Sequence, residues 1–431
     1  PEQSGTDKSV LATLIADVRY DLANGTYDDK TPEFRQRLTE AVDRAQTEVM
    51  DDPDAGQEEV DKAVTQIRDI LNEEAPPEKE PTAYYVDSES GDDSNTGTSQ
   101  DAPWKSLSKV NAQVFNPGDQ IYLKRGSVFT EEQLKPLGEG SNDQPIILDA
   151  YGEGNLPLIQ GNGKVDIAVH FVNTPYWEVS NIEVTNQGEE KKDGRTGIMI
   201  ENNQYGILRH FYLKDVYVHD VNGSDNGKNM QNGGIYARVY VDKNGKSDYR
   251  EFNPTKFEDL VIDGARVENV NRVGISVACN DVGYLYNECS AQYPEDLIEN
   301  FSSTDVVVRN CYIKNAGGDS IIAYHLKGGL FEYNVSDTAS QTSGAAGQYS
   351  AAMWPWRCVD TVYSHGNMGG CVMFCRSEAI NSVFRYNISQ NDYYFIDDNA
   401  GSPTAMIYNN TFYGGDNTLD VMKWNNADSK L

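Results

Sequence analysis

The sequence has little positive charge, few histidines and no long apolar run. Lys and Arg number 36 against 67 Asp and Glu in 431 residues, which gives a formal net charge of -31. A field of this sign opposes binding to nucleic acid and to anionic membrane surfaces. Since no run reaches the ~18 apolar residues of a membrane span, we expect no nucleic-acid partner and no membrane insertion.

Familiar metal and nucleophile motifs are also absent. The six cysteines lie between Cys279 and Cys375 without a Cys-x-x-Cys pair or a Cys/His cluster, so we predict that they are buried as small apolar residues and hold no metal. The Gly-x-Ser-x-Gly motif is missing, and the five histidines have no paired nucleophile at a telling spacing. We therefore expect no cofactor in a globular chain that is rich in Tyr and Gly.

Residues 1–74 are predicted to form a bundle of three short amphipathic helices. Thr31 before Pro32 is typical of an N-cap followed by proline at the first helical position. A Pro- and Glu-rich stretch, residues 75–82, is typical of a stiff linker. The apolar residues recur at helical spacing in three segments, 11–22, 34–49 and 60–71.

Residues 83–431 repeat two phrases that predict a parallel β-helix. An apolar strand ends near Asn or Gly, and a second strand, usually led by glycine, follows it. One coil every ~23 residues, stacked on the next, is a solenoid whose interior we expect to hold apolar and Asn ladders. Residues 420–431 are expected to be an unfinished coil with a cap or further domain missing. The first phrase occurs at 177–181, 211–215, 260–264, 306–310, 330–334, 383–387 and 406–410, and the second at 197–200, 234–237, 274–277, 319–323 and 370–374.

Several segments of this region resemble pectate-lyase-like β-helix enzymes. Ala-Pro-Trp-Lys-Ser-Leu at 102–107 is similar to the first coils of these enzymes. Gly-Gly-Asp-Ser-Ile at 317–321 and Trp-Pro-Trp at 354–356 are similar to their glycoside hydrolase branch, namely the lacto-N-biosidases of family 136 and the related family 141. Residues 1–74 resemble the FIVAR helical module. The resemblance implies an all-β right-handed parallel β-helix behind a helical spacer. It also implies a bacterial protein, secreted or on the cell surface, that hydrolyses O-glycosyl bonds of host or plant glycans, and we expect a monomer with an oligosaccharide substrate.

Alternation along the strands predicts which side chains face outward. With Ile198, Ile235, Ile275, Ile321 and Cys371 taken as inward, the outward positions combine aromatic, cationic and acidic groups that suit a sugar groove. For each Trp taken singly, core packing is the alternative. We predict that the following residues bind the substrate: Glu201, Tyr236, Arg238, Tyr324, His325, Trp354, Trp356, Phe374 and Arg376.

Glycoside hydrolysis usually needs two carboxyl groups about 5–9.5 Å apart. Because coils stack about 4.8 Å apart, the pair should lie on neighbouring coils or two coils apart. Asp319, Asp360 and Asp397 or Asp398 are the candidates that this condition leaves. For Asp319 and Asp360, the alternative is a role in capping turns.

One coil departs from the pattern. Asn334 and Asn387 are 53 residues apart, and the intervening segment 360–365 lacks the Tyr-Asn of the other coils. The resemblance implies an acidic Asp-Gly-x-x-x-Asp-x-Asp segment at this place, as the catalytic one. Its absence predicts weak or absent hydrolysis unless one of the four candidate aspartates substitutes.

Two alternatives remain open at this point. A polysaccharide lyase would bind Ca²⁺ through oxygen ligands, for which Asp87, Asp92 and Asp93 are candidates. A glycan-binding β-helix without catalysis would keep the aromatic residues and lose the acids. The sugar, the linkage and the stereochemical outcome do not follow from the sequence.

Overall fold

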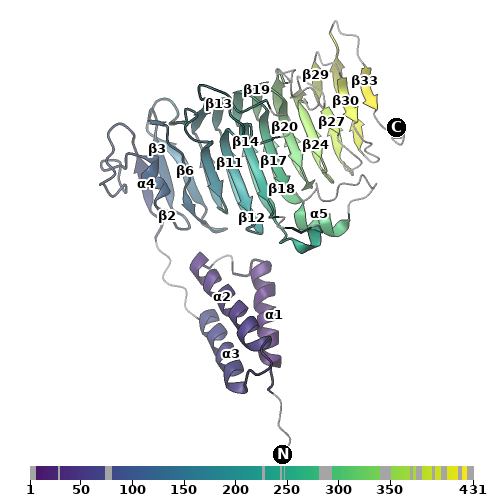
Figure 1. The fold of residues 1–431 in the computed structure, drawn as a ribbon. Helices are drawn as coiled ribbons and strands as arrows, with labels where there is room; N and C mark the ends of the chain where they lie inside the picture. Colours follow the sequence, from purple (N-terminus) through teal and green to yellow (C-terminus); the bar gives the residue numbers. More distant parts are fainter. Residues whose placement is uncertain are drawn as a thin grey trace, which may run out of the picture. The chain divides into compact units, whose positions relative to one another are not determined.

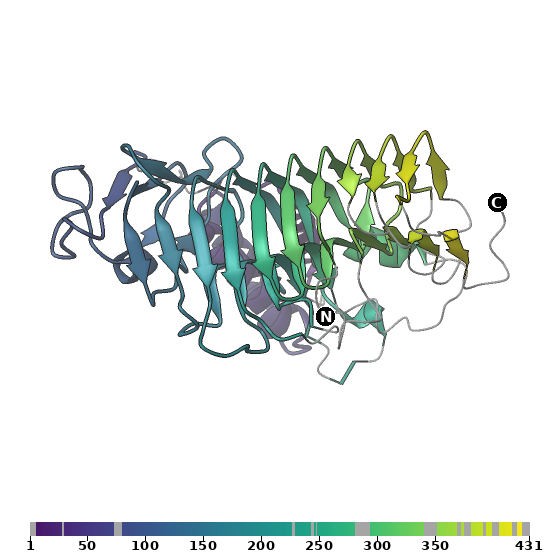
Figure 2. The same ribbon diagram turned by 90° about the horizontal axis from the view of Figure 1, so that it is seen from above.

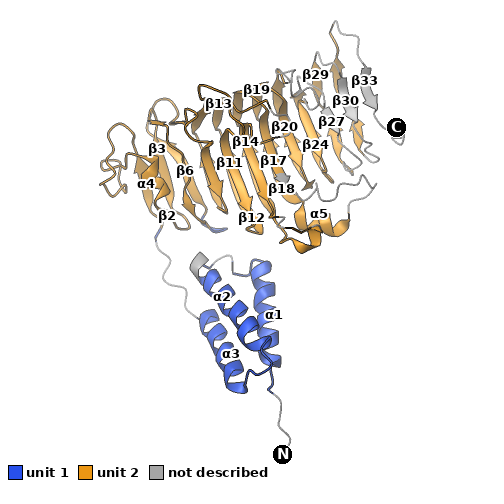
Figure 3. Ribbon diagram, viewed as in Figure 1, with its two compact units in different colours: residues 1–80, 141–144 blue, residues 81–140, 145–431 orange. Residues whose placement is uncertain are grey.

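A computed structural model gives the fold of the chain (Figure 1). The chain divides into two compact units, one of residues 1–80 with 141–144 and one of residues 81–140 with 145–431 (Figure 3). Among the described residues, no helix combines the length and the apolar character needed to cross a membrane. The structure describes residues 6–27, 30–72, 80–225, 229–242, 245–246, 248–280, 294–339, 351–368, 372–374, 381–390, 394–398, 405–415 and 420–424.

The first unit contains three α-helices, α1 (Ser9–Ala23), α2 (Pro32–Ala45) and α3 (Gln57–Leu71), and a π-helical turn (Gln46–Met50) that extends α2. Thr31 Oγ1 accepts a hydrogen bond from the Phe34 N–H at 3.2 Å, with Pro32 in the first turn, so the predicted cap is present. The helices bury one shared apolar cluster, which includes Leu11, Ile15, Leu38, Val42, Val60 and Ile67.

The second unit is built on three long parallel sheets, and Figure 2 shows their strands stacked side by side. Sheet A contains β1 (Ala83–Val86), β3 (Gln120–Lys124), β6 (Ile146–Tyr151), β9 (Trp177–Ser180), β12 (Ile207–Lys214), β15 (Lys256–Asp263), β18 (Ser303–Arg309), β22 (Leu330–Glu332), β25 (Val362–Ser364), β28 (Val383–Arg385) and β31 (Met406–Tyr408), with β21 (Leu326–Lys327) beside β18.

The other two long sheets follow the same order along the chain. Sheet C contains β4 (Val128–Thr130), β7 (Leu158–Gln160), β10 (Glu183–Asn186), β13 (Tyr217–Val221), β16 (Arg266–Val270), β19 (Tyr312–Ala316), β23 (Val335–Asp337), β26 (Asn367–Met368), β29 (Ile388–Gln390) and β32 (Thr411–Tyr413). Sheet D contains β8 (Ile167–Val172), β11 (Thr196–Asn203), β14 (Gly233–Tyr240), β17 (Val273–Asn280), β20 (Asp319–Tyr324), β24 (Met353–Trp356), β27 (Val372–Phe374), β30 (Tyr394–Asp398) and β33 (Asp420–Trp424).

From β6 onward, each turn of the chain contributes one strand to each of the three long sheets. The path runs from β12 in sheet A through β13 in sheet C and β14 in sheet D, and then returns to sheet A with β15. Strands of successive coils pair in parallel register, as in Phe211 with Leu260 and Val218 with Val267. The repeated phrases are therefore successive coils of a parallel β-helix, as the sequence predicts.

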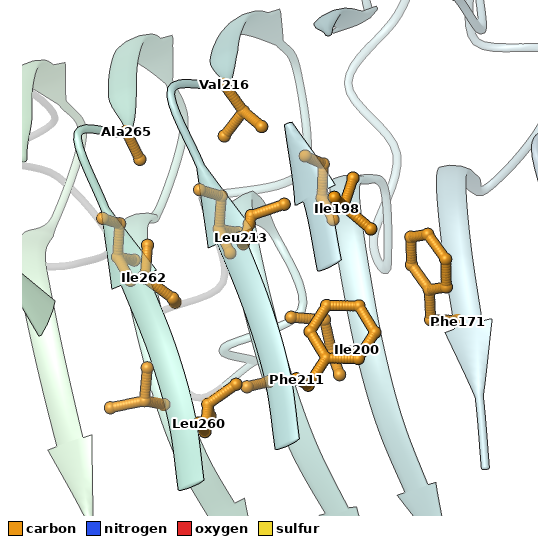
Figure 4. Close-up of a cluster of buried hydrophobic side chains, with 14 of the residues drawn as sticks. Phe171, Ile198, Ile200, Phe211, Leu213, Val216, Leu260, Ile262 and Ala265 are labelled. Carbon is orange, nitrogen blue, oxygen red and sulfur yellow. The ribbon is translucent and has the colours of Figure 1, made fainter. Parts of the chain in front are cut away.

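The interior of the coils is an apolar core. Ile198, Ile235, Ile275 and Ile321 all belong to one buried cluster, which confirms the predicted inward positions. In Figure 4 the side chains of Phe171, Ile200, Phe211 and their neighbours meet between the sheets. Every second residue of a strand can therefore enter the core while the next one faces away from it.

A ladder of asparagines closes the turn between sheets A and C. Asn334 Oδ1 accepts from the Cys311 N–H at 3.0 Å, and its Nδ2 donates to the Val308 carbonyl at 2.9 Å. Asn387 and Asn410 make the same kinds of contact in later coils. The predicted Asn ladder is confirmed.

The side chains of Cys311 and Cys358 are buried, in agreement with the prediction for these two cysteines. Burial raises the pKa of the Cys311 thiol to about 12, so this thiol stays protonated and unreactive at neutral pH. Cys289, Cys371 and Cys375 lie outside the described residues, as does the side chain of Cys279.

The N-terminal end of the β-helix is covered by the chain itself. The short helix α4 (Leu107–Asn111) buries Leu107 and Val110 completely, and Ser106 Oγ caps it by accepting from the Lys109 N–H at 3.2 Å. Beside it lies the two-stranded sheet B, formed by β2 (Val114–Phe115) and β5 (Leu137–Gly138). Further helical segments are α5 (Glu295–Phe301) and a 3₁₀ turn (Tyr249–Glu251).

Candidate functional site

The outer face of sheet D has a row of residues in register from strand to strand. Met199 on β11 pairs with Tyr236 on β14, and the row continues through Ser276 on β17, Ile322 on β20 and Trp354 on β24. Met199, Tyr236, Ile322 and Trp354 belong to a hydrophobic cluster separate from the interior core. They therefore point out of the coil, as predicted.

A charged cluster lies beside this row. Glu201 on β11 is only 8% exposed, and both of its carboxylate oxygens are bonded. Oε2 lies 2.9 Å from His170 Nε2, and Oε1 lies 3.3 Å from Arg238 Nη1. His170 comes from the preceding strand β8 and Arg238 from the following strand β14, so parallel stacking brings the three side chains together from successive coils.

Glu201 is held in its ionised form. Burial alone would raise its pKa, but the hydrogen bond with His170 and the charges of Arg238 and Lys135 outweigh burial and lower the pKa of Glu201. An ionised carboxylate with both oxygens bonded suits an acceptor that orients its neighbours, whereas a general acid must carry a proton. The geometry therefore fits the predicted binding role of Glu201 and Arg238 better than acid catalysis.

The lowered pKa of Glu201 predicts a specific pH dependence. Its stabilising contribution should be complete above about pH 4.3, the ordinary pKa of Glu, and should be lost as the pH falls through the lower value of the folded state. Between about pH 5 and pH 3, the unfolding free energy of Glu201→Gln should therefore fall less steeply than that of wild type. Urea unfolding of wild type and Glu201→Gln at both pH values measures this difference. An equal fall in the unfolding free energy of the two proteins would contradict the prediction.

The aromatic residues of sheet D are packed rather than exposed. Trp354 and Trp356 lie with ring centroids 5.7 Å apart and nearly parallel, and Tyr324 meets Trp356 edge-on at 4.3 Å. Tyr324 is 0% exposed, and Trp354, Tyr236 and Trp356 are 3%, 7% and 8% exposed. The predicted open aromatic groove is therefore wrong, because large rings on neighbouring strands cover one another together with Met230 and Ala351.

His325 follows the end of β20 at a left-handed backbone position, with φ 44°. Its side chain is 6% exposed, and its ring lies 5.7 Å from that of Tyr324. Burial and the nearby charge of Arg357 lower the pKa of His325 well below its ordinary value, so the ring is neutral. His325 thus lies at the end of the aromatic cluster, as predicted, but beneath the surface.

Asp319 forms a buried ion pair with Arg272. Both side chains are 0% exposed, and the second carboxylate oxygen of Asp319 accepts from the Ala351 N–H at 2.7 Å. Burial raises the pKa of Asp319, and the charge and hydrogen bond of Arg272 oppose that rise. The carboxyl group of Asp319, which the sequence predicts as catalytic, is therefore buried and accepts hydrogen bonds from two donors within the protein.

Asp360 occupies an exposed turn between β24 and β25. Its φ is 51°, a left-handed conformation that Asp tolerates in turns. Its Oδ1 accepts a hydrogen bond from Asn381 Nδ2 at 3.2 Å. This arrangement agrees with the alternative in which Asp360 caps a turn.

The last strands of sheet D correct the predicted alignment. Met353 pairs with Val372, and Val372 pairs with Ile396, so Val372 rather than Cys371 is level with the inward Ile321. A slip of one residue exchanges the two faces of a strand. Outward register positions therefore belong to Met373 and Asp397, instead of the predicted Phe374 and Asp398. The side chains of these four residues, and all of Arg376, lie outside the described part of the structure.

The carboxylates considered for calcium are bonded within the opening coil. Asp87 Oδ2 pairs with Lys124 Nζ at 2.6 Å, and Asp93 accepts from Ser106 Oγ at 2.7 Å and from two backbone N–H groups. Asp92 accepts from the Ser94 N–H at 2.8 Å. Within the described residues, no group of three or more His, Cys, Asp or Glu is placed to hold a metal ion.

Two partners of the predicted site residues do not follow from the sequence pattern, namely His170 beside Glu201 and Arg272 beside Asp319. His170 is the fourth residue of Ile-Ala-Val-His-Phe-Val, a strand without a leading glycine, so the repeated phrase does not reveal it. Aligning that strand with β11 would have placed His170 level with Met199. Arg272 precedes its strand, and its pairing with Asp319 depends on a turn that has no repeat signal.

Comparison with known proteins gives relatives for most of the chain. No family model matches it. It is 30% identical over 453 residues to a lacto-N-biosidase of Bifidobacterium longum subsp. longum, an alignment that covers 81% of this chain and 28% of that protein. A shorter match, 25% identical over 123 residues, is to the alpha-1,3-galactosidase A of Akkermansia muciniphila, with 27% of this chain and 20% of that protein covered.

A solved structure extends this relationship to the fold. The GH136 lacto-N-biosidase of Eubacterium ramulus superposes with a TM-score of 0.65 at 27% sequence identity, covering 85% of this chain and 72% of that chain. The chain spans little more than a quarter of the length of the Bifidobacterium protein that it matches. The chain is a homologue of the lacto-N-biosidases of glycoside hydrolase family 136.

Proposed function

We propose that this chain acts on glycans as a glycoside hydrolase, through the outer face of sheet D. The observation that carries the proposal is an ionised Glu201, 8% exposed, held on an outward face between His170 and Arg238. Such a cluster contributes nothing to the interior core, and enclosing charge is unfavourable unless it is paired. The relatives are bacterial glycosidases, which supports a glycan substrate. The secreted or surface location that the resemblance implies is part of the same proposal.

Each member of the cluster has a distinct role in the proposal. Arg238 keeps 28% of its side chain exposed and can donate further N–H groups to sugar hydroxyls. His170 has a second ring nitrogen available to hydrogen-bond a sugar, and Glu201 fixes the orientation of both partners. Tyr236 lies two residues before Arg238 on β14 and supports this face through the packed aromatic cluster.

The proposed catalytic carboxylates come from the last strands of sheet D. Among the described strands from β8 to β24, Glu201 and Asp319 are the two carboxylates of sheet D, and they lie three strands apart. At about 4.8 Å per strand, that separation is about 14 Å, which exceeds the about 9.5 Å limit for a glycosidase pair. Asp397, at an outward register position on β30, and Asp398 remain as proposed acids.

The same observation favours a second candidate function. A β-helix that keeps the Glu201 cluster but has no carboxylate pair on neighbouring strands would bind glycans without cleaving them. Glycan binding without product release would identify this case. The helical unit would then serve as the spacer that its resemblance to the FIVAR module implies.

We expect Glu201→Gln to weaken glycan binding by about tenfold or more, because a charge-assisted hydrogen bond contributes about 1.5–3 kcal/mol. A glycan array followed by titration calorimetry on the best ligand measures the effect. The matched control is Glu258→Gln on the outer face of sheet A, where the carboxylate pairs with Arg209 at 3.5 Å and is 38% exposed. Equal losses in both variants, or no binding by wild type, would contradict the proposal.

Product release from the same ligands separates hydrolysis from binding. Mass spectrometry of wild type, Asp397→Asn and Asp398→Asn tests the proposed acids directly. Activity that disappears in one of these variants supports the hydrolase. Activity that persists in both, and in Asp319→Asn and Asp360→Asn, would show that the catalytic acids lie elsewhere. An unsaturated product whose formation is stopped by a chelator would instead support the lyase alternative.

A further inference from the structure

Lys135 adds a second cation to the Glu201 cluster. It follows Leu134, which bridges to Val169 of β8 and is fully buried. Because alternate residues of an extended segment face opposite sides, Lys135 lies on the outer face beside His170, where it is exposed. Its charge contributes to the lowered pKa of Glu201. Lys135 therefore belongs to the same outer surface as Glu201.

Arg238 is held in place with part of its guanidinium group unused. Its Nη1 donates to Glu201 Oε1 at 3.3 Å, and its Cζ lies 4.8 Å from the centre of the Tyr240 ring. The strands that carry these residues, β11 and β14, lie side by side (Figure 1). Among the described residues, no other group accepts a hydrogen bond from this guanidinium. The edge formed by Nε and Nη2 is therefore available, in an orientation that Glu201 and Tyr240 maintain.

The charges of this cluster do not balance. Lys135 and Arg238 bring two positive charges, and Glu201 brings one negative charge. Within the part of the chain that the structure describes, Lys135 forms no ion pair. Counting His170 as uncharged, one positive charge is left over, on the surface of a chain whose net charge is -31. The cluster is therefore complementary to a ligand that brings one negative charge.

A carboxylate matches the unused edge of Arg238. The Nε and Nη2 N–H groups are coplanar and parallel, and a carboxylate has two coplanar oxygens that accept both of them. A sugar hydroxyl can also accept from this edge, but it leaves the surplus positive charge in place. The geometry and the charge together favour sugars that carry a carboxyl group, namely uronic acids and sialic acids, over neutral sugars.

We propose that the outer face of sheet D recognises a glycan with a carboxylated sugar, whose carboxylate binds the Nε and Nη2 edge of Arg238 and the ammonium group of Lys135. This inference rests on the proposed function, because it names the class of glycan that the Glu201 cluster takes. β14 is five strands away from β30, which carries Asp397, and the separation is about 24 Å at about 4.8 Å per strand. The acidic sugar is therefore recognised far from Asp397 and is not the unit whose bond is cleaved there.

Titration calorimetry with matched pairs of ligands tests the proposal. One pair is an oligosaccharide that ends in glucuronic acid and the same oligosaccharide ending in glucose, which lacks the carboxylate. The other pair is a sialylated oligosaccharide and its desialylated form. Wild type should bind at least one acidic ligand about tenfold or more tightly than its neutral partner. The pair that shows this preference identifies the source of the carboxylate.

Two variants separate the contributions of the cations. Arg238→Gln should abolish the preference for the acidic ligand, and Lys135→Gln should reduce it about two- to fivefold, because an exposed charge contributes less. Lys135 is exposed, so its substitution should leave the fold intact even if Arg238→Gln is destabilised. The matched control is Arg209→Gln on the outer face of sheet A. There Arg209 pairs with Glu258, and its side chain is 26% exposed, against 28% for Arg238.

Glu201→Gln distinguishes this inference from the proposed function. That variant removes the negative charge of the cluster, so it should weaken binding of both ligands of a pair while the preference for the acidic one is kept or increased. Equal affinity of wild type for acidic and neutral ligands, both weakened by Glu201→Gln, would overturn the inference and leave the proposed function standing. No binding to any of the four ligands would overturn both. A preference that survives Arg238→Gln and Lys135→Gln, or that Arg209→Gln removes equally, would overturn the inference alone.

Discussion

Replacing Arg272 with Met is expected to lower the free energy of unfolding by about 3–5 kcal/mol, the loss typical when one member of a buried ion pair is removed. The pair with Asp319 is completely buried on both sides. Without the guanidinium, Asp319 must either remain charged in an apolar setting or take up a proton, and both are unfavourable. Chemical denaturation at neutral pH measures the loss.

The control for this prediction is Arg309→Met. Arg309 pairs with Asp263 at 2.8 Å, but their side chains are 44% and 22% exposed. Exposed pairs contribute about 0–1 kcal/mol, so this variant should stay close to wild type. The double variant Arg272→Met/Asp319→Leu should recover much of the loss, since it leaves no unpaired charge. Equal destabilisation by Arg272→Met and Arg309→Met would contradict the explanation.

Asn334→Ala is expected to destabilise the fold by about 2–4 kcal/mol, because it leaves two buried backbone groups without this partner. The side-chain amide of Asn334 forms hydrogen bonds with the Cys311 N–H and the Val308 carbonyl, and Asn334 is 1% exposed. Alanine can replace neither bond. Thermal and urea unfolding of the same variant should agree if the transition is two-state.

Gln390→Ala is the matched control for the asparagine ladder. Its amide bonds Asn367 at 3.1 Å from an exposed position, so water can replace it. A change within about 0.5 kcal/mol is expected for such a surface substitution. If Asn334→Ala were equally mild, the ladder would be a consequence of stacking rather than a cause of its stability.

The coils were predictable because their signal repeats. An apolar alternation that returns about every coil, with Asn or Gly at its end, depends on contacts between equivalent positions, so sequence spacing carries the information. The inward Ile198, Ile235, Ile275 and Ile321 and the Asn ladder follow from it. The cap formed by Thr31 before Pro32 is equally local, and it too is present.

The site was only partly predictable, because its burial depends on what covers the coil. Alternation places Glu201, Arg238 and Tyr324 outward, but it does not distinguish an outward residue in water from one beneath neighbouring rings. Tyr324 is 0% exposed for the second reason. The pairing of Asp319 with Arg272 arises from a turn without a repeat. A one-residue slip in the alignment also exchanged the register positions of Asp397 and Asp398, since strand faces alternate at every position.

The parallel register between coils also determines how such a chain tolerates change in length. Because each coil contacts only its two neighbours through equivalent positions, removing one whole coil joins two surfaces that already match, as in Phe211 above Leu260. Stability and activity are then separable under coil deletion: the fold survives, while side chains that had acted together across the lost layer are brought to a new spacing. Insertion or deletion of about one coil can therefore give such a solenoid a chemical function or remove it. No sequence that fails to fold is needed between the two forms.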